Sequence, residues 1–542
     1  MADAEDGDYP ALRVALNEDE ISTGNTEDSL LSSSSRTSTE TISCSRMRST
    51  QCCPEEKNSK FAKNCKIFSG IFLICWGVAM IVYKPYNMLM DLRIELTPGL
   101  PPYEWWLDPP DEVLLKVYLF NITNSEEFLA GTDKKIKVSE VGPITYREKL
   151  THTNPTFNEN GTFTYTANRT AIYLPEMNTI DLNATIVMPN LAVLLIPSYL
   201  WDAPLFSKFG VNLMMRSLRS KPFINTTIYN YLWNCTDPIL DVSQAVAPSL
   251  VPTKNVGVLG RVYTDFVDNV TVYIGTKFGH EKFFLIDKYD GSEYMPDLEG
   301  KCEDKVANSS EGISYPQYLT KNDTLRYWRK TLCRVGTLRY SHEVEMYGVT
   351  AYRYELENTT YDRTTPSDGD CYKGEPKLPN GLSDVSKCNF DMPFAASFPH
   401  YLHGDRAVKN SVDGLRPDAE KHGSFVIVEP NTGIPLHGIA RSQVNLVMRE
   451  MRGFSEKIQR FSNVTIPLVW MEYNQVGIPW YIEWLIYFTV VLVPVLQYVG
   501  MAFFIGLGGF LVVYFGSRRS RRSNLLKNKA LTFETQVFLK PS

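Results

Sequence analysis

Two long apolar segments lie near opposite ends of this chain, and they constrain its fold more than any other feature. The first covers residues 67–83, between Lys66 and Lys84. As a helix it is about 26 Å long, slightly shorter than a hydrocarbon core of about 30 Å, and the flanking lysines can reach the interface. The second lies within the uncharged stretch 484–517, which Arg518 follows. We therefore expect a membrane protein with two terminal transmembrane helices.

Every N-glycosylation sequon lies between these two segments. The sites are Asn121, Asn160, Asn168, Asn183, Asn225, Asn234, Asn269, Asn308, Asn322, Asn358 and Asn463. Glycans are added in the lumen of the secretory pathway, so the middle of the chain faces the lumen or the cell exterior. Basic residues beside both segments, such as Lys63 and Arg519, agree with the positive-inside rule and place both termini in the cytosol.

The topology divides the chain into five predicted parts. They are a disordered cytosolic tail (1–65), a first transmembrane helix (66–84), a glycosylated extracellular or lumenal domain (85–483), a second transmembrane helix (484–517) and a cytosolic C-terminal tail (518–542). The first tail is predicted to be disordered because 12 of its residues 31–50 are Ser or Thr and aromatic residues are almost absent. Tyr9 and Leu12 in this tail fit the short sorting pattern that clathrin adaptors bind.

The middle domain is predicted to be mostly strands. Short runs rich in Val, Ile, Thr, Tyr and Phe are separated by Gly, Pro, Asn and Asp, and they cover 113–120, 136–141, 162–165, 258–266, 270–274, 282–286, 349–356 and 424–429. Many short strands indicate a sandwich or a barrel.

One stretch of the middle domain, residues 190–233, shows a helical pattern instead. Apolar residues recur at helical intervals at Phe206, Phe209, Leu213 and Leu218. A second helix is expected from about 224 to 233. Three cations make this helical stretch basic, namely Arg216, Arg219 and Lys221. They form either a ligand-binding surface or ordinary solvated charges.

The motifs of common enzyme classes are missing from the sequence. It contains no Gly-x-Ser-x-Gly nucleophile elbow, no His-Glu-x-x-His zinc helix and no phosphate-binding loop. His400, His403 and Asp405 have the residue types of metal ligands, but their loop is rich in Phe and Pro and favours a structural role. We expect a protein that is not an enzyme, with no cofactor, no metal site and no nucleic-acid partner.

Several longer motifs carry a resemblance to a known family. They are Tyr103-Glu104-Trp105-Trp106, Lys116-Val117-Tyr118-Leu119-Phe120-Asn121, Glu140-Val141-Gly142-Pro143-Ile144, Phe398-Pro399-His400-Tyr401-Leu402, Gln443-Val444-Asn445 and Pro467-Leu468-Val469-Trp470. With these motifs the chain resembles the class B scavenger receptors, or fatty-acid translocase family. The family includes the lysosomal integral membrane protein and the insect sensory neuron and epithelial membrane proteins. The resemblance covers nearly everything from the first span to the second.

The resemblance implies an α+β extracellular domain with an antiparallel β-barrel core, a lipid tunnel and an apical helical bundle, here at about 190–233. It implies ligand binding at the basic apex, for which Arg216, Arg219 and Lys221 are the candidates. The apex lysine of the family falls near Ser217, so the charge is kept in the neighbourhood and not at that position.

Five of the ten cysteines lie in the middle domain, where disulfides persist. The resemblance implies the pairs Cys302–Cys371 and Cys333–Cys388. Cys235 is left over, either as a free thiol, as a link between two copies in a homo-oligomer, or as a buried side chain.

Two functions are compatible with these features. The first is a plasma-membrane receptor that binds lipids, fatty acids, sterols, lipoproteins or other anionic ligands at the apex and transfers lipid through the tunnel to the membrane. The second is an endosomal or lysosomal membrane receptor that binds and sorts a protein cargo through the same bundle.

Overall fold

The computed structural model describes residues 55–538, apart from 111, 249–250, 252, 265–267, 296–303, 363–370, 373 and 375–376. The chain divides into two units, residues 1–62 and 63–542. Tyr9 and Leu12 of the predicted sorting signal lie outside the described residues.

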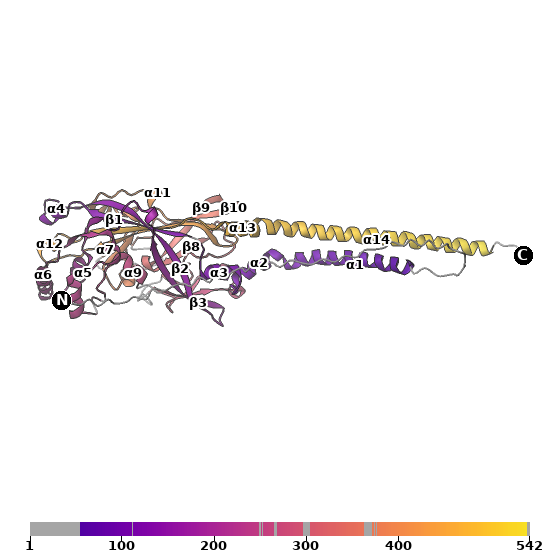
Figure 1. The fold of residues 1–542 in the computed structure, drawn as a ribbon, viewed down its shortest axis with the longest axis horizontal. Helices are drawn as coiled ribbons and strands as arrows, with labels where there is room; N and C mark the ends of the chain where they lie inside the picture. Colours follow the sequence, from indigo (N-terminus) through magenta and orange to yellow (C-terminus); the bar gives the residue numbers. More distant parts are fainter. Residues whose placement is uncertain are drawn as a thin grey trace, which may run out of the picture. The chain divides into compact units, whose positions relative to one another are not determined.

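A large, mainly antiparallel sheet forms the framework of the second unit (Figure 1). The strands are β1 (Val113–Ile122), β2 (Ile136–Phe157), β3 (Thr162–Tyr173), β4 (Thr185–Pro189), β5 (Phe223–Thr227), β6 (Asp268–Tyr273), β7 (Ile286–Tyr289), β8 (Thr324–Arg329), β9 (Arg334–Met346), β10 (Val349–Leu356), β11 (Ser383–Asp384), β12 (Phe394–Ser397), β13 (Val412–Asp413), β14 (Phe425–Glu429), β15 (Ile434–Val447) and β16 (Thr465–Gln475). Fourteen of them belong to one sheet with the order β7-β6-β3-β2-β1-β16-β15-β14-β10-β9-β8, and β4 and β5 pair separately.

The two edges of this sheet are joined by residues 308–310. On one side Ile286 of β7 exchanges backbone hydrogen bonds with Asn308 and Ser309. On the other side Ser310 exchanges them with β8, donating to Arg326 and accepting from Trp328. Hydrogen bonding therefore continues from β7 to β8 and closes the sheet on itself, as in a barrel.

The apolar sequence of strand β16 explains its position in the middle of the sheet. It pairs with β1 on one side and β15 on the other. Eight consecutive residues, 466–473, are buried, so both of its faces lie inside the protein. The near-continuous apolar run from Ile466 to Met471 matches a strand covered on both faces.

The helices connect the strands, and the two long ones, at the beginning and the end of the described chain, extend from the same end of the sheet domain (Figure 1). They are α1 (Glu55–Tyr83), α2 (Pro85–Ile94), α3 (Pro101–Leu107), α4 (Ser125–Ala130), α5 (Leu191–Tyr199), α6 (Leu205–Ser217), α7 (Ile228–Trp233), α8 (Pro238–Val246), α9 (Val258–Thr264), α10 (Arg406–Lys409), α11 (Ala419–His422), α12 (Glu456–Gln459), α13 (Trp480–Tyr487) and α14 (Val493–Phe538).

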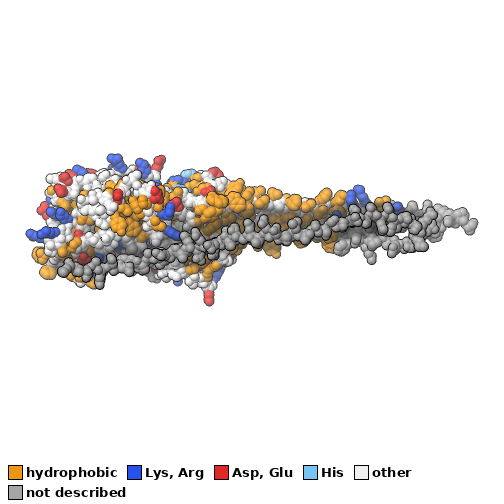
Figure 2. All heavy atoms as spheres, viewed as in Figure 1, with side chains coloured by type: hydrophobic (Ala, Val, Ile, Leu, Met, Phe, Trp, Pro, Cys, Tyr) orange, Lys and Arg blue, Asp and Glu red, His pale blue; other side chains and the backbone are white. Residues whose placement is uncertain are grey.

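Two helical segments are long and apolar enough to cross a membrane. They are residues 64–83 of α1 and residues 480–529 of the C-terminal segment, in which a π-helix over Phe488–Leu492 joins α13 to α14. Their surface is mostly hydrophobic (Figure 2). The two helices meet at Gly70 and Gly508, where a Cβ on Gly508 would lie 2.6 Å from the carbonyl oxygen of Gly70. Only glycine allows the two backbones to approach so closely.

Two of the predicted strands are wrong. Residues 258–264 form helix α9 instead of a strand. Gly257 and Gly260 lie against the backbone of Trp233, where a Cβ would come within 2.8 and 2.7 Å, so packing against the end of α7 decides the conformation. Lys282 ends a 3-10 helix (His280–Lys282), a turn follows in which Phe284 has a φ of 59°, and strand β7 begins only at Ile286.

The helical stretch 190–233 contains α5, α6 and α7, but its second helix begins later than expected. Residues Phe223–Thr227 pair with β4 as strand β5, and α7 starts at Ile228. The Thr227 side chain accepts the backbone N–H of Asn230 and caps the helix.

Candidate functional site

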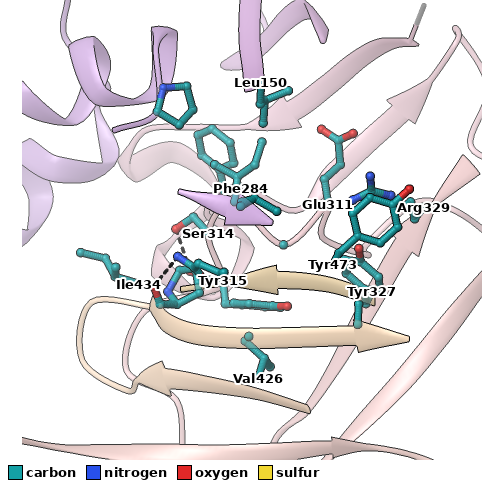
Figure 3. A pocket seen from close by; sticks show the side chains of 18 of the residues that line it. Leu150, Phe284, Glu311, Ser314, Tyr315, Tyr327, Arg329, Val426, Ile434 and Tyr473 are labelled. Atoms are coloured by element: carbon teal, nitrogen blue, oxygen red, sulfur yellow. Dashed lines mark hydrogen bonds between the residues drawn. The ribbon is translucent and has the colours of Figure 1, made fainter. Parts of the chain in front are cut away.

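A cavity of about 720 Å³ lies within the sheet domain (Figure 3). Leu150, Phe284, Val426 and Ile434 contribute apolar side chains to its lining. They come from β2, the turn before β7, β14 and β15, so inward-facing residues of several strands build one wall. A lining of this kind suits a ligand with a hydrocarbon portion.

The same cavity reaches the beginning of the C-terminal apolar segment. Ile482, Leu485 and Ile486 of α13 and Thr489 of the π-helix line it. Trp105 of α3 also lines the cavity and packs against Tyr481 of α13, with ring centroids 5.8 Å apart. The cavity therefore extends to the first turns of a helix that is apolar enough to enter a bilayer.

A cluster of charged side chains closes another part of the wall. Arg329 donates two hydrogen bonds of 3.0 Å to the carboxylate of Glu148, and Tyr263 donates a third of 2.6 Å. Arg329 also lies 3.7 Å from the ring centroid of Tyr473. Burial raises the pKa of the Glu148 carboxyl, but Arg329 and Arg169 outweigh it, and the net shift is downward.

Among the acids of this cluster, Glu311 has the negative charge that is least well balanced by nearby cations. Tyr165 donates a hydrogen bond of 2.8 Å to it, and the nearest nitrogen of Arg169 lies 3.6 Å away. Burial raises the pKa of Glu311 despite these partners. Figure 3 shows Glu311 beside Arg329 and Tyr473, on the far side of the cavity from Ser314 and Ile434.

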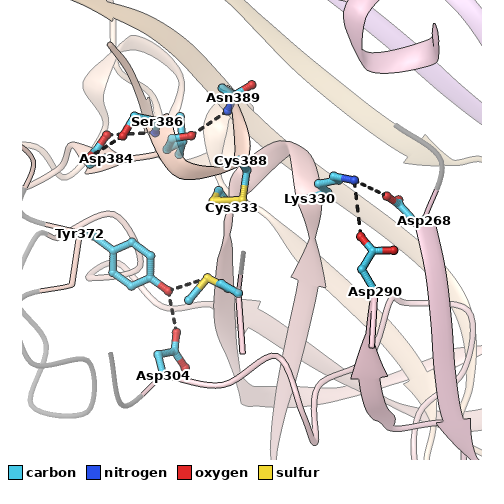
Figure 4. The surroundings of a disulfide bond; sticks show 12 residues. Asp268, Asp290, Asp304, Lys330, Cys333, Tyr372, Asp384, Ser386, Cys388 and Asn389 are labelled. Carbon is cyan, nitrogen blue, oxygen red and sulfur yellow. Dashed lines mark hydrogen bonds and ion pairs between the residues drawn. A yellow bond between two sulfur atoms is a disulfide. The ribbon is translucent and has the colours of Figure 1, made fainter. Parts of the chain in front are cut away.

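The cluster continues away from the cavity through Asp268. Arg169 lies 3.5 Å from Asp268, and Lys330 lies 3.0 Å from Asp268 and 3.8 Å from Asp290 (Figure 4). Acids and bases alternate, so each buried charge has an opposite neighbour.

The three predicted ligand-binding cations lie at and beyond the end of α6. Arg216, Arg219 and Lys221 are all exposed, and Arg219 has a positive φ of 56° where the chain leaves the helix. None of them lies within salt-bridge distance of a carboxylate in the part of the chain that the structure describes. The structure thus leaves these three charges to the solvent.

Three of the four apolar residues that indicated α6 do not face the core, whereas the fourth, Leu218, packs against it. Phe206, Phe209 and Leu213 are exposed, Phe206 to 86 %, whereas Lys208 and Val211 are buried. The Lys208 ammonium group donates to the carbonyls of Trp201 and Arg452 and lies 5.5 Å from the ring of Phe454. Helix α6 therefore presents an apolar stripe outward and satisfies a buried lysine with backbone oxygens.

Cys333 and Cys388 form a disulfide with 5.6 Å between their Cα atoms (Figure 4), which is one of the two expected pairs. Cys371 is also disulfide-bonded. Cys302 lies outside the described residues, so the pair Cys302–Cys371 stays a prediction.

Cys235 is a free, buried thiol. Burial raises its pKa to about 12. Of the three alternatives for this residue, a link between two copies is the one that the buried position does not fit.

All eleven sequon asparagines are described, and nine have exposed side chains. Asn121 and Asn168 are half-buried: Asn121 accepts the N–H of Val187, and Asn168 donates to the Thr153 hydroxyl. Glycosylation at these sites stays a prediction.

His400 and His403 do not converge on a common point. Both ring nitrogens of His400 are engaged, one with Glu140 at 2.6 Å and the other with the N–H of Arg416. His400 stacks on His422, while His403 packs against Phe398. No group of metal-binding side chains occurs among the residues with described positions.

The charged wall of the cavity was not identified from the sequence. Glu148, Arg169 and Arg329 lie in or at the ends of strands that otherwise look ordinary. A charge at an inward position of a strand is the only sequence signal for them, and inward positions become known only with the strand register.

Comparison with known proteins places this architecture in a family. Residues 67–518 match the model of the CD36 family. Scavenger receptor class B member 1 of Rattus norvegicus is 28% identical over 454 residues, which cover 82% of this chain and 86% of the relative. Lysosome membrane protein 2 of Mus musculus is 29% identical over 398 residues, covering 71% and 80%. The matched region contains both apolar helices and the whole sheet domain, and the chain therefore belongs to the CD36 family.

Proposed function

We propose that this protein is a scavenger-receptor-type membrane receptor that binds lipids or lipoproteins at the surface around α6 and passes lipid through its cavity to the bilayer. The observation that carries the proposal is the cavity wall, because it contains both inward strand residues and the first turns of α13. A lipid in this cavity would leave it beside a membrane-entering helix.

The physical reason for such a route is the cost of moving hydrocarbon through water. Each CH₂ group exposed to water costs about 0.8 kcal/mol, so an acyl chain crosses an aqueous gap slowly. Residues such as Phe284, Val426 and Ile482 offer apolar contact along the cavity instead. A connection from the α6 surface to this cavity is part of the proposal.

The surface around α6 suits a particle with both apolar and anionic groups. Its stripe of Leu205, Phe206, Phe209 and Leu213 offers exposed apolar contacts. Arg216, Arg219 and Lys221 add unpaired positive charge at the end of the same helix. Lipoproteins and anionic vesicles combine these two properties, and we propose them as ligands.

The experiment that tests the proposal uses the full-length glycosylated protein in lipid nanodiscs. Ala440 lines the cavity on β15, and Ala440→Trp should fill part of it. We expect labelled fatty acid or sterol to reach the nanodisc bilayer more slowly through this variant, with lipoprotein binding unchanged.

The matched control is Ser139→Trp, at an exposed position of β2. Equal transfer rates in the wild type, Ala440→Trp and Ser139→Trp would refute the cavity route. Loss of lipoprotein binding in Ala440→Trp alone would show that the substitution disturbs more than the cavity.

The exposed stripe of α6 also favours a second candidate function, the recognition of a protein cargo. Aromatic residues on an exposed helix face are typical anchors of protein interfaces. Phe206→Ser with Phe209→Ser should then abolish capture of a cargo protein while lipid transfer continues. Continued cargo binding by this variant would remove α6 from that function.

We also propose the topology and location of the receptor. Both termini lie in the cytosol, and the receptor resides in the plasma membrane, with endosomes and lysosomes as the alternative for a cargo receptor. Adaptor binding at Tyr9 and Leu12 would support endocytosis. Glycosidase sensitivity and antibody access in intact and permeabilised cells test the topology.

A further inference from the structure

Arg93 is one of the charged residues that line the cavity. It lies in the last turn of α2, which begins directly after the first apolar helix. Its guanidinium donates to the carbonyl oxygen of Thr432 and, over 3.4 Å, to the hydroxyl of Ser314. The group also lies 5.2 Å from the ring centroid of Phe283. Arg93 is thus held in the cavity wall by neutral partners.

Several other cations of the wall are paired with carboxylates. Arg329 contacts Glu148 at 3.0 Å, and Arg441 contacts Glu472 at 2.7 Å. Towards the outside, Arg147 pairs with Glu112. These pairs leave little positive charge for a ligand.

Arg93 has no carboxylate within 4 Å among the described residues. The acid that acts on it from a distance is Glu429, which is fully buried. The Glu429 carboxylate accepts hydrogen bonds from the backbone and side chains of Asn431 and Thr432, so its own loop occupies it. The guanidinium of Arg93 is therefore left without a direct counter-ion.

Some N–H groups of Arg93 also have no hydrogen-bond acceptor among the described residues. A guanidinium has five N–H donors, and the described contacts use two of them. The third nitrogen of Arg93, Nε, has no hydrogen-bond partner among the described residues, and it is not one of the fully buried atoms in that position, so it keeps some accessible surface. Because Arg93 lines the cavity, its free donors are accessible from there.

Burial lowers the pKa of Arg93 to about 10, so the group stays positively charged at neutral pH. A charged guanidinium with free donors beside apolar walls favours a planar anion such as a carboxylate, which it can bind through two parallel hydrogen bonds.

We propose that Arg93 binds the anionic head group of a lipid inside the cavity, with a fatty-acid carboxylate as the expected group. The acyl chain would lie along the apolar side chains of Phe284, Leu150 and Val426. Figure 3 shows Ser314, a partner of Arg93, on the opposite side of the cavity from the Glu311–Arg329 cluster. That cluster contains its own counter-ions, so the anion has reason to bind at the Arg93 side. This inference rests on the proposed lipid-carrying function and adds the residue that binds the head group.

The test measures equilibrium binding of oleate, oleyl alcohol and phosphatidic acid to the full-length protein in nanodiscs at neutral pH. Arg93→Gln should weaken oleate binding by about tenfold or more, because hydrogen bonds to a charged group are lost. Oleyl alcohol has the same chain without the charge, and its affinity should not change. Arg93→Lys should retain part of the oleate affinity, since it keeps the charge without the fork.

The matched control is Arg339→Gln, an exposed arginine of β9 that pairs with Glu357 outside the cavity. It should bind all three probes like the wild type. A loss of phosphatidic acid and not of oleate in Arg93→Gln would support the anion site and assign it to a phosphate head group.

Three results would overturn the inference. Unchanged binding of both oleate and phosphatidic acid in Arg93→Gln would show that Arg93 binds no anionic head group. Equal weakening of oleate and oleyl alcohol would show that Arg93 only fixes α2 to Ser314 and Thr432. If the wild type bound none of the three probes, the proposal of a lipid-carrying cavity itself would be refuted, and this result is distinct from a failure of Arg93 alone.

Discussion

The two basic regions of this molecule differ in how their positive charges are stabilised. At the end of α6, Arg216, Arg219 and Lys221 are exposed and unpaired in the described part of the chain. In the cavity wall, the side chains of Arg169 and Arg329 are only 18 % and 16 % exposed, and they are matched with Glu148, Asp268 and Glu311. Water screens the first group, so its charges are tolerated singly and remain available for ligands. The second group lies away from water, and each charge there needs a partner.

The sharpest test of this difference is the removal of one partner in the buried group. Arg329→Met leaves the Glu148 carboxylate without its closest cation, and we expect it to lower the free energy of unfolding by about 3–5 kcal/mol. Denaturant unfolding of the full-length protein measures the change. The control Arg339→Met breaks an exposed pair with Glu357 and should cost about 0–1 kcal/mol. Equal losses in both variants would contradict the comparison.

A smaller effect is expected from pH, through His152 beside the cavity wall. His152 is buried against Trp106, and burial lowers its pKa from 6.5 to about 4. The unfolded chain therefore binds a proton between pH 6.5 and 4 that the folded protein does not bind. Stability is complete above pH 6.5 and falls as the pH is lowered, by about 2 kcal/mol at pH 5.

The measurement is thermal unfolding of the wild type and His152→Phe at pH 7.4 and pH 5. The variant should lose less stability on acidification than the wild type. The exposed His342, changed to Phe in the same way, serves as control and should leave the pH dependence as it is. A pH dependence as steep in His152→Phe as in the wild type would assign the effect to other groups.

The smallest effect on stability is expected at the exposed group. Replacing Arg216, Arg219 and Lys221 together by Gln should change the free energy of unfolding by less than about 0.5 kcal/mol, because these side chains are exposed and have no described ion pair. Binding to anionic vesicles should nevertheless become roughly tenfold weaker at low salt. The difference from the wild type should shrink as salt is added.

Vesicle flotation at several salt concentrations measures this binding. The matched control replaces the exposed Lys134, Lys288 and Lys421 by Gln, which makes the same change in net charge elsewhere on the surface. Equal losses in both triple variants would show that overall charge, and not the α6 region, attracts the vesicles.

Helices α6 and α9 show where prediction from the sequence succeeds and where it fails. The period of 3.6 located α6 correctly, although the helix turns its apolar stripe outward. In α9 the residues Val258, Val262 and Tyr263 favour a strand by composition, yet contact with the end of α7 through Gly257 and Gly260 makes the segment helical. Local sequence patterns thus located a helix such as α6. Contacts between distant segments decided which side chains of α6 are buried and that α9 is a helix.

The sequence by itself determined the two apolar helices, the position of the sequons between them, the basic cluster after α6 and the motifs of the CD36 family. These properties depend on residues that are close together in the chain. Only the tertiary structure decided that Glu148 meets Arg329 across 181 positions, that Arg93 lacks a direct counter-ion and that the cavity reaches α13. The physical reason is strand register: a shift by one residue reverses which side chains face inward, and the register is fixed by packing across the whole sheet.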